Sequence, residues 1–250
     1  MIKPLLYLRS LLLVPILALH TLLCSFLILG MLILRFPRKW VDFAISRIWC
    51  TPLLVLAGIR VECQGCENVP LDKGFLFLFT HSSHFDIPVL FNCSPKGFRF
   101  GAKIELLSIP FFGQAAKLAG TLPIARQDRA SVIEVYKQAE SRVAAGESFA
   151  LAPEGTRRKG AELQPFKSGP FIFARNTKSP VVPVILSGVE HVMPKGSLWI
   201  NCDRWTRTVG VRFLPPLETK DIPEEKIKDF RDQVRAEMVE VFEEMKPKYT

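Results

Sequence analysis

The first strong pattern along the chain is an N-terminal apolar run without charge. No Asp, Glu, Lys or Arg occurs over 10–34, and most of the residues there are Leu or Ile. At about 1.5 Å per helical residue, a helix of that length can cross a hydrocarbon core of about 30 Å. The run is longer than the apolar part of a signal peptide, and Arg35, Arg38 and Lys39 follow it instead of a small-residue cleavage site. We therefore expect a retained membrane-anchoring helix over 10–34.

The flanks of this run bear on its orientation. Lys3 and Arg9 precede it and the basic cluster follows it, so both sides are positively charged. The excess on the following side favours a cytoplasmic location for the rest of the chain. Pro15, His20 and Gly30 leave open a bent, re-entrant hairpin that enters and leaves one leaflet.

A second stretch, 40–58, is also apolar and aromatic, with charges only at Asp42 and Arg47. This pattern is typical of an interfacial helix, which would lie beside the first helix. A helix packed on the globular part of the protein is the alternative. We therefore divide the chain into a membrane anchor over 1–58 and a folded domain over 59–250.

From about residue 59 the pattern changes to short apolar runs that alternate with helical stretches. Runs of strand length occupy 60–63, 74–79, 148–152, 181–186 and 207–213. Helical spacing of apolar residues predicts helices over 130–145 and from Pro223 onward. Strands that alternate with helices are typical of the α/β class, with a mostly parallel or mixed sheet flanked by helices.

Composition narrows the classes of protein. Hydrophobic residues make up 48% and charged residues 23% of the 250 residues, which argues against a disordered chain and against a protein made mostly of membrane spans. The 33 Lys and Arg against 24 Asp and Glu give a net charge of +9, so anionic partners are expected: nucleic acid, anionic lipid or a phosphorylated substrate. The chain has no helix-turn-helix, zinc-finger or RNA-recognition signature, so we do not expect nucleic-acid binding.

The number and spacing of the cysteines do not predict a disulfide framework. Six are scattered along the chain, and we expect a reducing compartment in which most of the thiols pack as small apolar residues. Cys63 and Cys66 form a single CxxC pair, which is weak evidence for either zinc or redox chemistry.

The first candidate catalytic residues are His81, His84 and Asp86, which share one loop after the most apolar predicted strand. Loops at the carboxyl ends of strands in open α/β sheets are where ligands bind. His81 and Asp86 can pair only across a turn, and the pair would act as a general base whose carboxylate orients the imidazole. A structural histidine with a helix-capping aspartate is one alternative, and a metal site that includes His84 is another. Ser82 and Ser83 lack the G-x-S-x-G nucleophile motif and are expected to serve the turn.

A second loop, 153–159, follows another predicted strand and is basic. Gly155 lets the backbone turn or approach a ligand closely, Thr156 offers a hydroxyl group, and Arg157 and Arg158 offer forked donors for phosphate oxygens. Further candidate cations are Lys103, Arg126 and Lys167. Each could be a solvated surface charge, but together they suggest cations around one phosphorylated ligand near a general base. A membrane anchor suggests that this ligand is a lipid.

These loops resemble the motifs of the glycerolipid acyltransferase family, most closely those of bacterial 1-acylglycerol-3-phosphate acyltransferases. His81 and Asp86 are similar to the family's His-x4-Asp catalytic motif. Three later segments resemble the second, third and fourth motifs: 120–126, 153–157 with 166–169 behind it, and 182–184. The matching span covers about residues 74–188, and four motifs in order are far more specific than one.

Departures from the family pattern bear on substrate preference. Thr80 stands where many members have Asn, and Arg158 stands where Ser is frequent. After Val184 the second proline that glycerol-3-phosphate acyltransferases tend to have is missing, which favours the lysophosphatidate enzymes.

The resemblance implies transfer of a fatty acyl group from acyl-CoA or acyl carrier protein to the sn-2 hydroxyl of 1-acyl-sn-glycerol-3-phosphate, which gives phosphatidic acid for phospholipid synthesis. His81 would be the base and Asp86 would orient it, with no covalent acyl-enzyme, no metal and no cofactor. The residues implied in substrate binding are Lys103, Arg126, Glu154, Gly155, Thr156, Arg157 and Lys167. The enzyme would work on the cytoplasmic face of the inner membrane, among anionic lipids.

Three alternatives remain open at the level of sequence. A related acyltransferase could use glycerol-3-phosphate, another lysophospholipid or an acylated amino-acid lipid as acceptor. A non-catalytic membrane module could bind anionic lipid through the basic loops. A membrane-tethered metalloenzyme would require stoichiometric metal.

Overall fold

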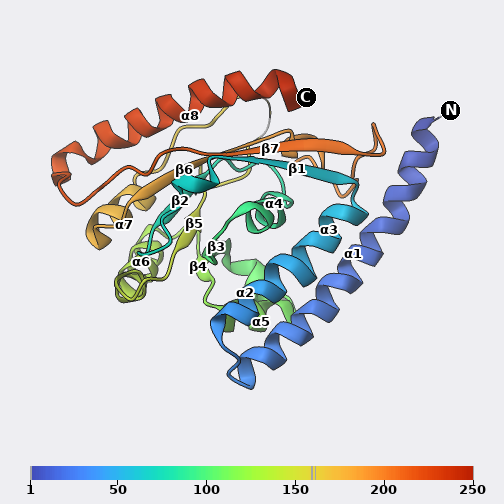
Figure 1. Ribbon diagram of the computed structural model, residues 1–250, viewed down its shortest axis with the longest axis horizontal. Coiled ribbons are helices and arrows are strands. Elements are labelled where there is room, and N and C mark those ends of the chain that lie inside the picture. Colours follow the sequence, from blue (N-terminus) through green and yellow to red (C-terminus); the bar gives the residue numbers. More distant parts are fainter. Residues whose placement is uncertain (1, 159, 161, 250) are drawn as a thin grey trace.

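The fold is a sheet between two layers of helices, as shown by the computed structural model, which describes residues 2–158, 160 and 162–249 (Figure 1). In these residues seven strands form one sheet in the order β1-β7-β6-β2-β5-β3-β4. The strands are β1 (Ile59–Gln64), β2 (Leu76–Phe79), β3 (Arg99–Lys103), β4 (Leu122–Ile124), β5 (Phe149–Leu151), β6 (Val181–Ser187) and β7 (Arg207–Phe213). Among the strands that the structure describes, β6 and β7 pair in the antiparallel sense and all other pairs are parallel. The predicted α/β class with a mostly parallel or mixed sheet is confirmed.

The helices fall into two groups, one on each face of the sheet. One face is covered by α1 (Ile2–Ile33), α2 (Arg38–Phe43), the π-helix η1 (Ala44–Cys50), α3 (Thr51–Leu56), α4 (Asp86–Cys93) and α5 (Phe112–Ala119). The other face is covered by α6 (Arg129–Ala144), α7 (Gly169–Thr177) and α8 (Ile227–Tyr249). The short 3-10 helices are η2 (Cys66–Asn68), η3 (Ile104–Ser108), η4 (Val189–His191) and η5 (Glu224–Lys226).

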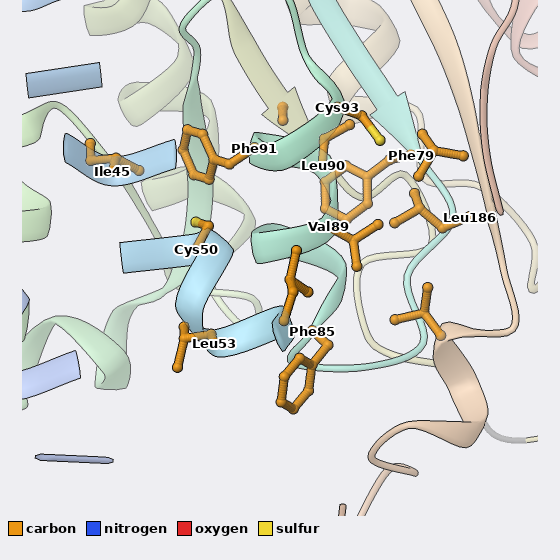
Figure 2. Packing of buried hydrophobic residues seen from close by; sticks show 14 of the residues in the cluster. Ile45, Cys50, Leu53, Phe79, Phe85, Val89, Leu90, Phe91, Cys93 and Leu186 are labelled. Atoms are coloured by element: carbon orange, nitrogen blue, oxygen red, sulfur yellow. The ribbon is translucent and has the colours of Figure 1, made fainter. Parts of the chain in front are cut away.

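Alternation along the central strand β2 explains why both faces need helices. Phe77 and Phe79 point into the core under α4, whereas Leu76 and Leu78 point toward α6–α8. All four side chains are buried, as expected for a parallel strand covered on both faces. Figure 2 shows the first of these cores, where α4 packs against Phe79 and against the η1–α3 segment. Each fully buried large apolar side chain contributes about 1.5–3 kcal/mol to folding.

The five predicted strands and two predicted helices are present, with boundaries shifted by a few residues. Asp128 caps α6 by accepting a hydrogen bond from the Ser131 backbone N–H at 3.0 Å. Along α8 the predicted apolar stripe is buried at Ile227, Val234 and Met238. The two strands that sequence analysis missed, β3 and β4, have five and three residues, and their burial is interrupted, so they carry little apolar signal.

The N-terminal helix α1 is longer than the predicted helix over 10–34 and runs unbroken through Pro15 and Gly30. It therefore does not form a hairpin within itself. The chain reverses after α1, and α2, η1 and α3 return beside it while also packing on the sheet core. His20 Nε2 lies 3.1 Å from the Trp49 carbonyl oxygen, and Trp49 Nε1 donates to Thr21 Oγ1 at 3.2 Å.

One face of α1 packs on the domain and the rest of the helix is exposed. The buried stripe consists of Leu6, Leu13, Leu17, Cys24 and Ile28, and most of the other Leu and Ile side chains on α1 are exposed. Among the described residues, α1 is the one helix that is long and apolar enough to cross a membrane. The apolar N-terminal helix supports membrane association of the protein.

Two of the six cysteines depart from the expectation of mostly packed thiols. Cys63 on β1 and Cys93 at the end of α4 form a disulfide, with their Cα atoms 5.9 Å apart. Spacing along the chain does not reveal this pair because α4 reaches β1 only through the tertiary fold. Cys24 and Cys50 are buried thiols, as expected, and Cys66 and Cys202 are partly exposed thiols.

The disulfide is expected to stabilise the fold. It closes a segment of 30 residues, for which loss of unfolded-chain entropy predicts about 3–4 kcal/mol. A Cys63→Ala/Cys93→Ala double variant should lower the free energy of unfolding in urea by about this amount, and Cys202→Ala should not. Equal urea midpoints for the double variant and the wild type would contradict this role.

Candidate active site

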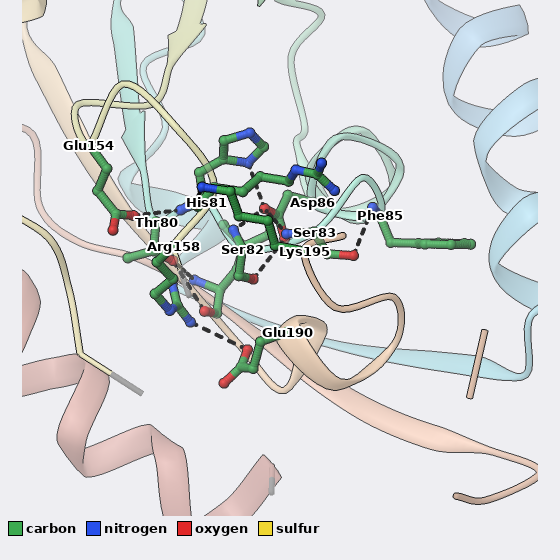
Figure 3. A network of polar contacts seen from close by, with 12 residues as sticks. Thr80, His81, Ser82, Ser83, Phe85, Asp86, Glu154, Arg158, Glu190 and Lys195 are labelled. Atoms are coloured by element: carbon green, nitrogen blue, oxygen red, sulfur yellow. Dashed lines mark hydrogen bonds and ion pairs between the residues drawn. The ribbon is translucent and has the colours of Figure 1, made fainter. Parts of the chain in front are cut away.

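The turn between β2 and α4 brings His81 and Asp86 together (Figure 3). The His81 Nδ1–H donates to Asp86 Oδ2 at 2.8 Å. The same oxygen accepts the backbone N–H groups of Ser82 at 2.6 Å and Ser83 at 2.9 Å. Asp86 is the first residue of α4 and its side chain is fully buried. Three donors therefore hold the carboxylate in one orientation, and that orientation determines the position of the imidazole ring.

This geometry leaves the other ring nitrogen of His81 available. A carboxylate can only accept, so the ring proton lies on Nδ1 and Nε2 carries the lone pair. In the described part of the chain Nε2 has no hydrogen-bond partner, and 13% of the side chain is exposed. A neutral imidazole with a free Nε2 and a carboxylate on Nδ1 can accept a proton from a hydroxyl group.

The two serines of this loop serve its conformation. Ser83 Oγ donates to the Met193 carbonyl oxygen at 3.0 Å and accepts the Phe85 backbone N–H at 3.3 Å. Ser82 Oγ lies 3.4 Å from Asp86 Oδ1. These contacts agree with the interpretation of both residues as turn residues.

Glu154 holds the backbone of His81 from the neighbouring strand end. It is 3% exposed, and its two carboxylate oxygens accept the backbone N–H groups of His81 at 2.9 Å and Gln164 at 3.0 Å. Burial raises the pKa of this carboxyl above its ordinary value. Because both oxygens bind backbone donors, Glu154 positions the His81 backbone, and its part in substrate binding stays a prediction.

The rest of the basic loop surrounds the same histidine. Gly155 adopts the left-handed conformation, with φ +74°, and so turns the loop back after Glu154. The Arg158 backbone N–H donates to the His81 carbonyl oxygen at 2.8 Å. The Arg158 guanidinium is buried, lies 3.3 Å from Glu190 Oε2 and stacks over the Phe242 ring at 4.5 Å. Arg158, predicted as a phosphate ligand, therefore ties the loop to η4 and α8.

Arg157 has the features of a ligand-binding cation. Its Nη1 atom is buried without a hydrogen-bond partner among the described residues. Arg126, which follows β4, is close enough that its pKa is lowered by desolvation and then by the positive charge of Arg157. Two cations that repel one another beside an unpartnered N–H group are suited to a phosphate.

The remaining predicted residues divide into two sets. A cleft of about 800 Å³ is lined by Arg126, Glu154, Gly155, Thr156 and Lys167, among others. Lys103 does not belong to this lining and pairs with Glu105 at 3.0 Å, where both side chains are exposed. Of the predicted cations, Arg126 and Lys167 line the cleft, Arg157 lies close enough to Arg126 to lower its pKa, and Lys103 and Arg158 are paired elsewhere.

Thr80 and His84 flank the catalytic pair in the loop after β2. Thr80, in place of the more frequent Asn, is buried and exchanges hydrogen bonds with the backbone of Leu186, donating at 3.1 Å and accepting at 2.9 Å. It therefore fastens the end of β2 to β6. His84 is exposed, and partial desolvation and then the charge of Arg157 lower its pKa. Among the described residues no group of three or more His, Cys, Asp and Glu side chains is arranged to hold a metal ion.

Lys195 is a site residue that sequence analysis missed. It lies in the loop after η4, and its Nζ donates to Thr156 Oγ1 at 3.1 Å and to the Arg157 carbonyl oxygen at 2.6 Å. It thereby holds the basic loop from the end of β6. No motif marks this lysine, and its neighbours Pro194 and Gly196 indicate only a turn.

Comparison with known proteins shows the family of the chain. The sequence model of the acyltransferase family matches residues 60–187, which is about half of the chain and includes His81, Asp86 and the basic loop. The chain belongs to the acyltransferase family. The matched segment runs from β1 to the end of β6 and contains the His81–Asp86 pair.

Individual relatives of this acyltransferase share about a third of their aligned residues with it. A chloroplastic 1-acyl-sn-glycerol-3-phosphate acyltransferase of Brassica napus is 34% identical over 65% of this chain and 47% of its own length. A 1-acyl-sn-glycerol-3-phosphate acyltransferase of Saccharomyces cerevisiae is 31% identical over 83% of this chain and 67% of its own. The chain thus spans about half the length of some curated relatives that it matches, including one from Arabidopsis thaliana at 45%.

A solved structure shows the same fold over nearly the whole chain. It is the 1-acyl-sn-glycerophosphate acyltransferase of Thermotoga maritima, with a TM-score of 0.82, 23% sequence identity and 98% of each chain covered. The N-terminal helices are therefore part of a shared fold and are not specific to this sequence.

Replacing Glu154 tests its positioning role. Glu154→Gln presents an amide N–H where the His81 or Gln164 backbone needs an acceptor, so we expect acyl transfer to lose about ten- to a hundredfold in kcat with little change in KM. The exposed Glu225→Gln should match the wild type. A change in KM alone would contradict the positioning role.

Glu154→Gln should also change how the free energy of unfolding depends on pH. Because burial raises the pKa of Glu154 in the folded protein, its contribution to stability is present below about pH 4.5 and is lost as the pH rises through the raised pKa. The free energy of unfolding of the wild type should fall across that range relative to Glu154→Gln. Parallel pH profiles in urea denaturation would contradict this assignment.

Proposed function

We propose that this protein transfers a fatty acyl group from acyl-CoA or acyl carrier protein to the sn-2 hydroxyl of 1-acyl-sn-glycerol-3-phosphate, giving phosphatidic acid. The observation that carries the proposal is the His81–Asp86 pair at 2.8 Å, with Nε2 left free beside a basic loop. The names of the Brassica and Saccharomyces relatives support the same acceptor. Phosphatidic acid is a precursor in phospholipid synthesis.

The chemistry follows from the protonation state of the pair. His81 Nε2 takes the proton of the sn-2 hydroxyl, and the resulting oxygen nucleophile attacks the carbonyl carbon of the thioester. Asp86 stabilises the imidazolium that forms. When the C–S bond breaks, the imidazolium returns the proton to the leaving thiolate. No acyl-enzyme is needed, and Ser82 and Ser83 already serve the turn.

The acceptor phosphate is assigned to Arg157 and Arg126. A phosphate oxygen supplies the acceptor that the buried Arg157 Nη1 lacks, and its negative charge relieves the repulsion between the two guanidinium groups. Thr156 and the Gly155 backbone lie on the same loop and complete this end of the cleft. A second acceptor with a phosphomonoester, such as glycerol-3-phosphate, would use the same cations.

The membrane side of the molecule is assigned to the layer that contains α1. Large apolar side chains are exposed along α1, on α2 and beside α5, including Leu12, Leu19, Leu23, Trp40 and Phe111. An exposed apolar surface of this kind is suited to a bilayer with anionic lipids, which the net charge of +9 also favours. We assign this surface to the cytoplasmic face of the inner membrane, where the lipid acceptor lies.

The first experiment measures phosphatidic acid formation by detergent-purified protein from 1-acyl-sn-glycerol-3-phosphate and oleoyl-CoA or oleoyl carrier protein. His81→Ala should lower turnover about a thousandfold, within the general-base range of about 10² to 10⁴, and Asp86→Asn should lower it strongly. His84→Gln is the matched control and should stay within a few-fold of the wild type.

Two outcomes would contradict the proposal. Turnover by His81→Ala equal to that of the wild type would show that His81 is not the general base. Lipid binding without turnover on any phosphorylated acceptor or donor would favour a non-catalytic module that binds anionic lipid.

Arg157 gives a separate prediction on the acceptor. Arg157→Gln should raise the KM for 1-acyl-sn-glycerol-3-phosphate about ten- to a hundredfold, because a charged hydrogen bond to phosphate is lost. Arg175→Gln on α7, where the half-buried Arg175 pairs with Glu224, removes the same charge away from the site and should leave KM unchanged. An unchanged KM in Arg157→Gln would place the phosphate elsewhere.

A further inference from the structure

The loop that joins η4 to β7, residues 193–206, begins at the active site. The Met193 carbonyl oxygen accepts a hydrogen bond at 3.0 Å from Ser83 Oγ, which belongs to the loop of His81. Two residues later, Lys195 Nζ donates to the basic loop at 3.1 and 2.6 Å. The 193–206 loop therefore contacts both loops that form the site.

Further along, the 193–206 loop lies against the first turns of α1 (Figure 1). The Ile200 backbone N–H donates to Ser10 Oγ at 2.7 Å, and Ser10 is fully buried. The Trp199 ring meets the Tyr7 ring edge to face, with the ring centroids 5.4 Å apart. The loop and the N-terminal part of α1 thus form one continuous surface.

Large apolar and aromatic side chains are exposed on this surface. Leu198 is 68% exposed, Trp199 is 44% exposed and Trp205 is 48% exposed. Tyr7 is exposed as well, and the surface continues along α1 through other exposed leucines. We call Tyr7, Leu198, Trp199 and Trp205 the aromatic patch. Contiguous exposed apolar patches are typical of surfaces that contact a protein partner or a membrane.

The loop presents the aromatic patch in a fixed conformation. The Pro194 carbonyl oxygen accepts the Ser197 backbone N–H at 3.0 Å, and Ser197 Oγ accepts the Trp199 backbone N–H at 3.0 Å. The Asn201 backbone N–H donates to the Val192 carbonyl oxygen at 2.9 Å and closes the loop at its base. Little ordering is therefore needed when a partner covers the patch.

Basic side chains border the aromatic patch. The Arg9 guanidinium lies over the Trp205 ring at 5.2 Å, and Arg204 is exposed beside it. The one acidic residue in the sequence of the loop is Asp203, whose carboxylate accepts hydrogen bonds from Arg204 and Arg207. Trp and Tyr beside Arg and Lys are typical of the boundary between a membrane and water.

We propose that the 193–206 loop is a second membrane-contact element, which places the aromatic patch in the interface of a lipid bilayer and holds the His81 site next to that bilayer. A lipid surface is favoured as partner because the patch continues into the exposed apolar side chains of α1. In this respect the proposal rests on the proposed function, which assigns the α1 surface to the membrane.

The contact explains how a lipid acceptor reaches the site. Lys195 and Trp199 are four residues apart, so no more than about 14 Å of extended chain separates the contact with the basic loop from the interface. The acceptor can then present its headgroup to the site while its acyl chain stays in the bilayer.

Quenching by brominated lipid tests the contact without turnover. The chain has four tryptophans, and a Trp40→Phe/Trp49→Phe/Trp205→Phe variant keeps Trp199 as the single emitter. The intact protein is reconstituted into vesicles of phosphatidylcholine and phosphatidylglycerol, with or without bromine on the acyl-chain carbons near the headgroups. We expect bromine to remove most of the Trp199 emission, because bromine quenches tryptophan at contact range.

A matched control places the emitter on the opposite layer. Ile133→Trp on α6, in a chain whose four native tryptophans are replaced by Phe, puts the probe at an exposed position away from α1 and should keep its emission. Equal quenching at the two positions would overturn the proposal. Trp199 emission that depends on protein concentration and not on bromine would assign the patch to a second copy of the chain and overturn it as well.

Activity gives a second test in a chain that keeps its native tryptophans. Leu198→Ser should lower turnover of 1-oleoyl-sn-glycerol-3-phosphate in vesicles about tenfold, because the burial of one apolar side chain in the interface is lost. Turnover of the water-soluble 1-hexanoyl acceptor should be unchanged. Leu71→Ser, at an equally exposed position before the start of β2, should match the wild type on both acceptors.

The two tests separate this proposal from the proposed function. An equal loss on both acceptors in Leu198→Ser, or no loss on either, would overturn the membrane contact. If bromine quenches Trp199 while the wild type forms no phosphatidic acid, the contact stands and the proposed reaction fails. If phosphatidic acid forms while Trp199 keeps its emission, the reaction stands and the contact fails.

Discussion

The parallel pairing of β2 with β5 and β6 is the constraint on which the site depends. Leu78 pairs with both Leu151 and Pro183, so β2 and β5 end within one residue of each other, while β6 continues beside them to Ser187. His81 and Glu154 each lie three residues beyond the paired Leu78 and Leu151, and this register brings the His81 backbone N–H within 2.9 Å of the Glu154 carboxylate. A shift of one residue in the register would reverse the side chains of a strand that is buried on both faces, so the core enforces the alignment.

The same edge holds His81 by three independent contacts. Asp86 orients its ring, Glu154 accepts its backbone N–H, and the Arg158 backbone N–H donates to its carbonyl oxygen. Burying two carboxylates is costly, and hydrogen bonds to backbone amides and to the imidazole offset that cost. The result is an imidazole that needs little reorganisation before it takes a proton, which is how preorganised sites lower reaction barriers.

Sequence analysis could predict the features that depend on neighbours in the chain. The apolar runs of β2 and β6 reveal buried strands, and the short spacing between His81 and Asp86 is compatible with a single turn. It could not reveal Lys195 or the Cys63–Cys93 disulfide, because each joins segments that only the tertiary fold brings together. Sequence analysis named Arg158 as a possible phosphate donor but could not show that its guanidinium is buried beside Glu190 and the Phe242 ring, because both partners lie on distant segments of the chain.

The sheet separates two surfaces of opposite character, and this separation suits a reaction between a lipid and a water-soluble thioester. Exposed Leu and aromatic side chains lie on the layer of α1, whereas the cationic cleft lies between α6, α7 and α8. His81 stands at the strand ends, where the two layers meet. Arg126, one of the two cations assigned to the acceptor phosphate, lines this cleft, so the assigned phosphate position and the exposed apolar surface lie on opposite sides of the sheet. A lipid acceptor that reaches from the bilayer to Arg126 therefore has to pass the strand ends, where His81 stands.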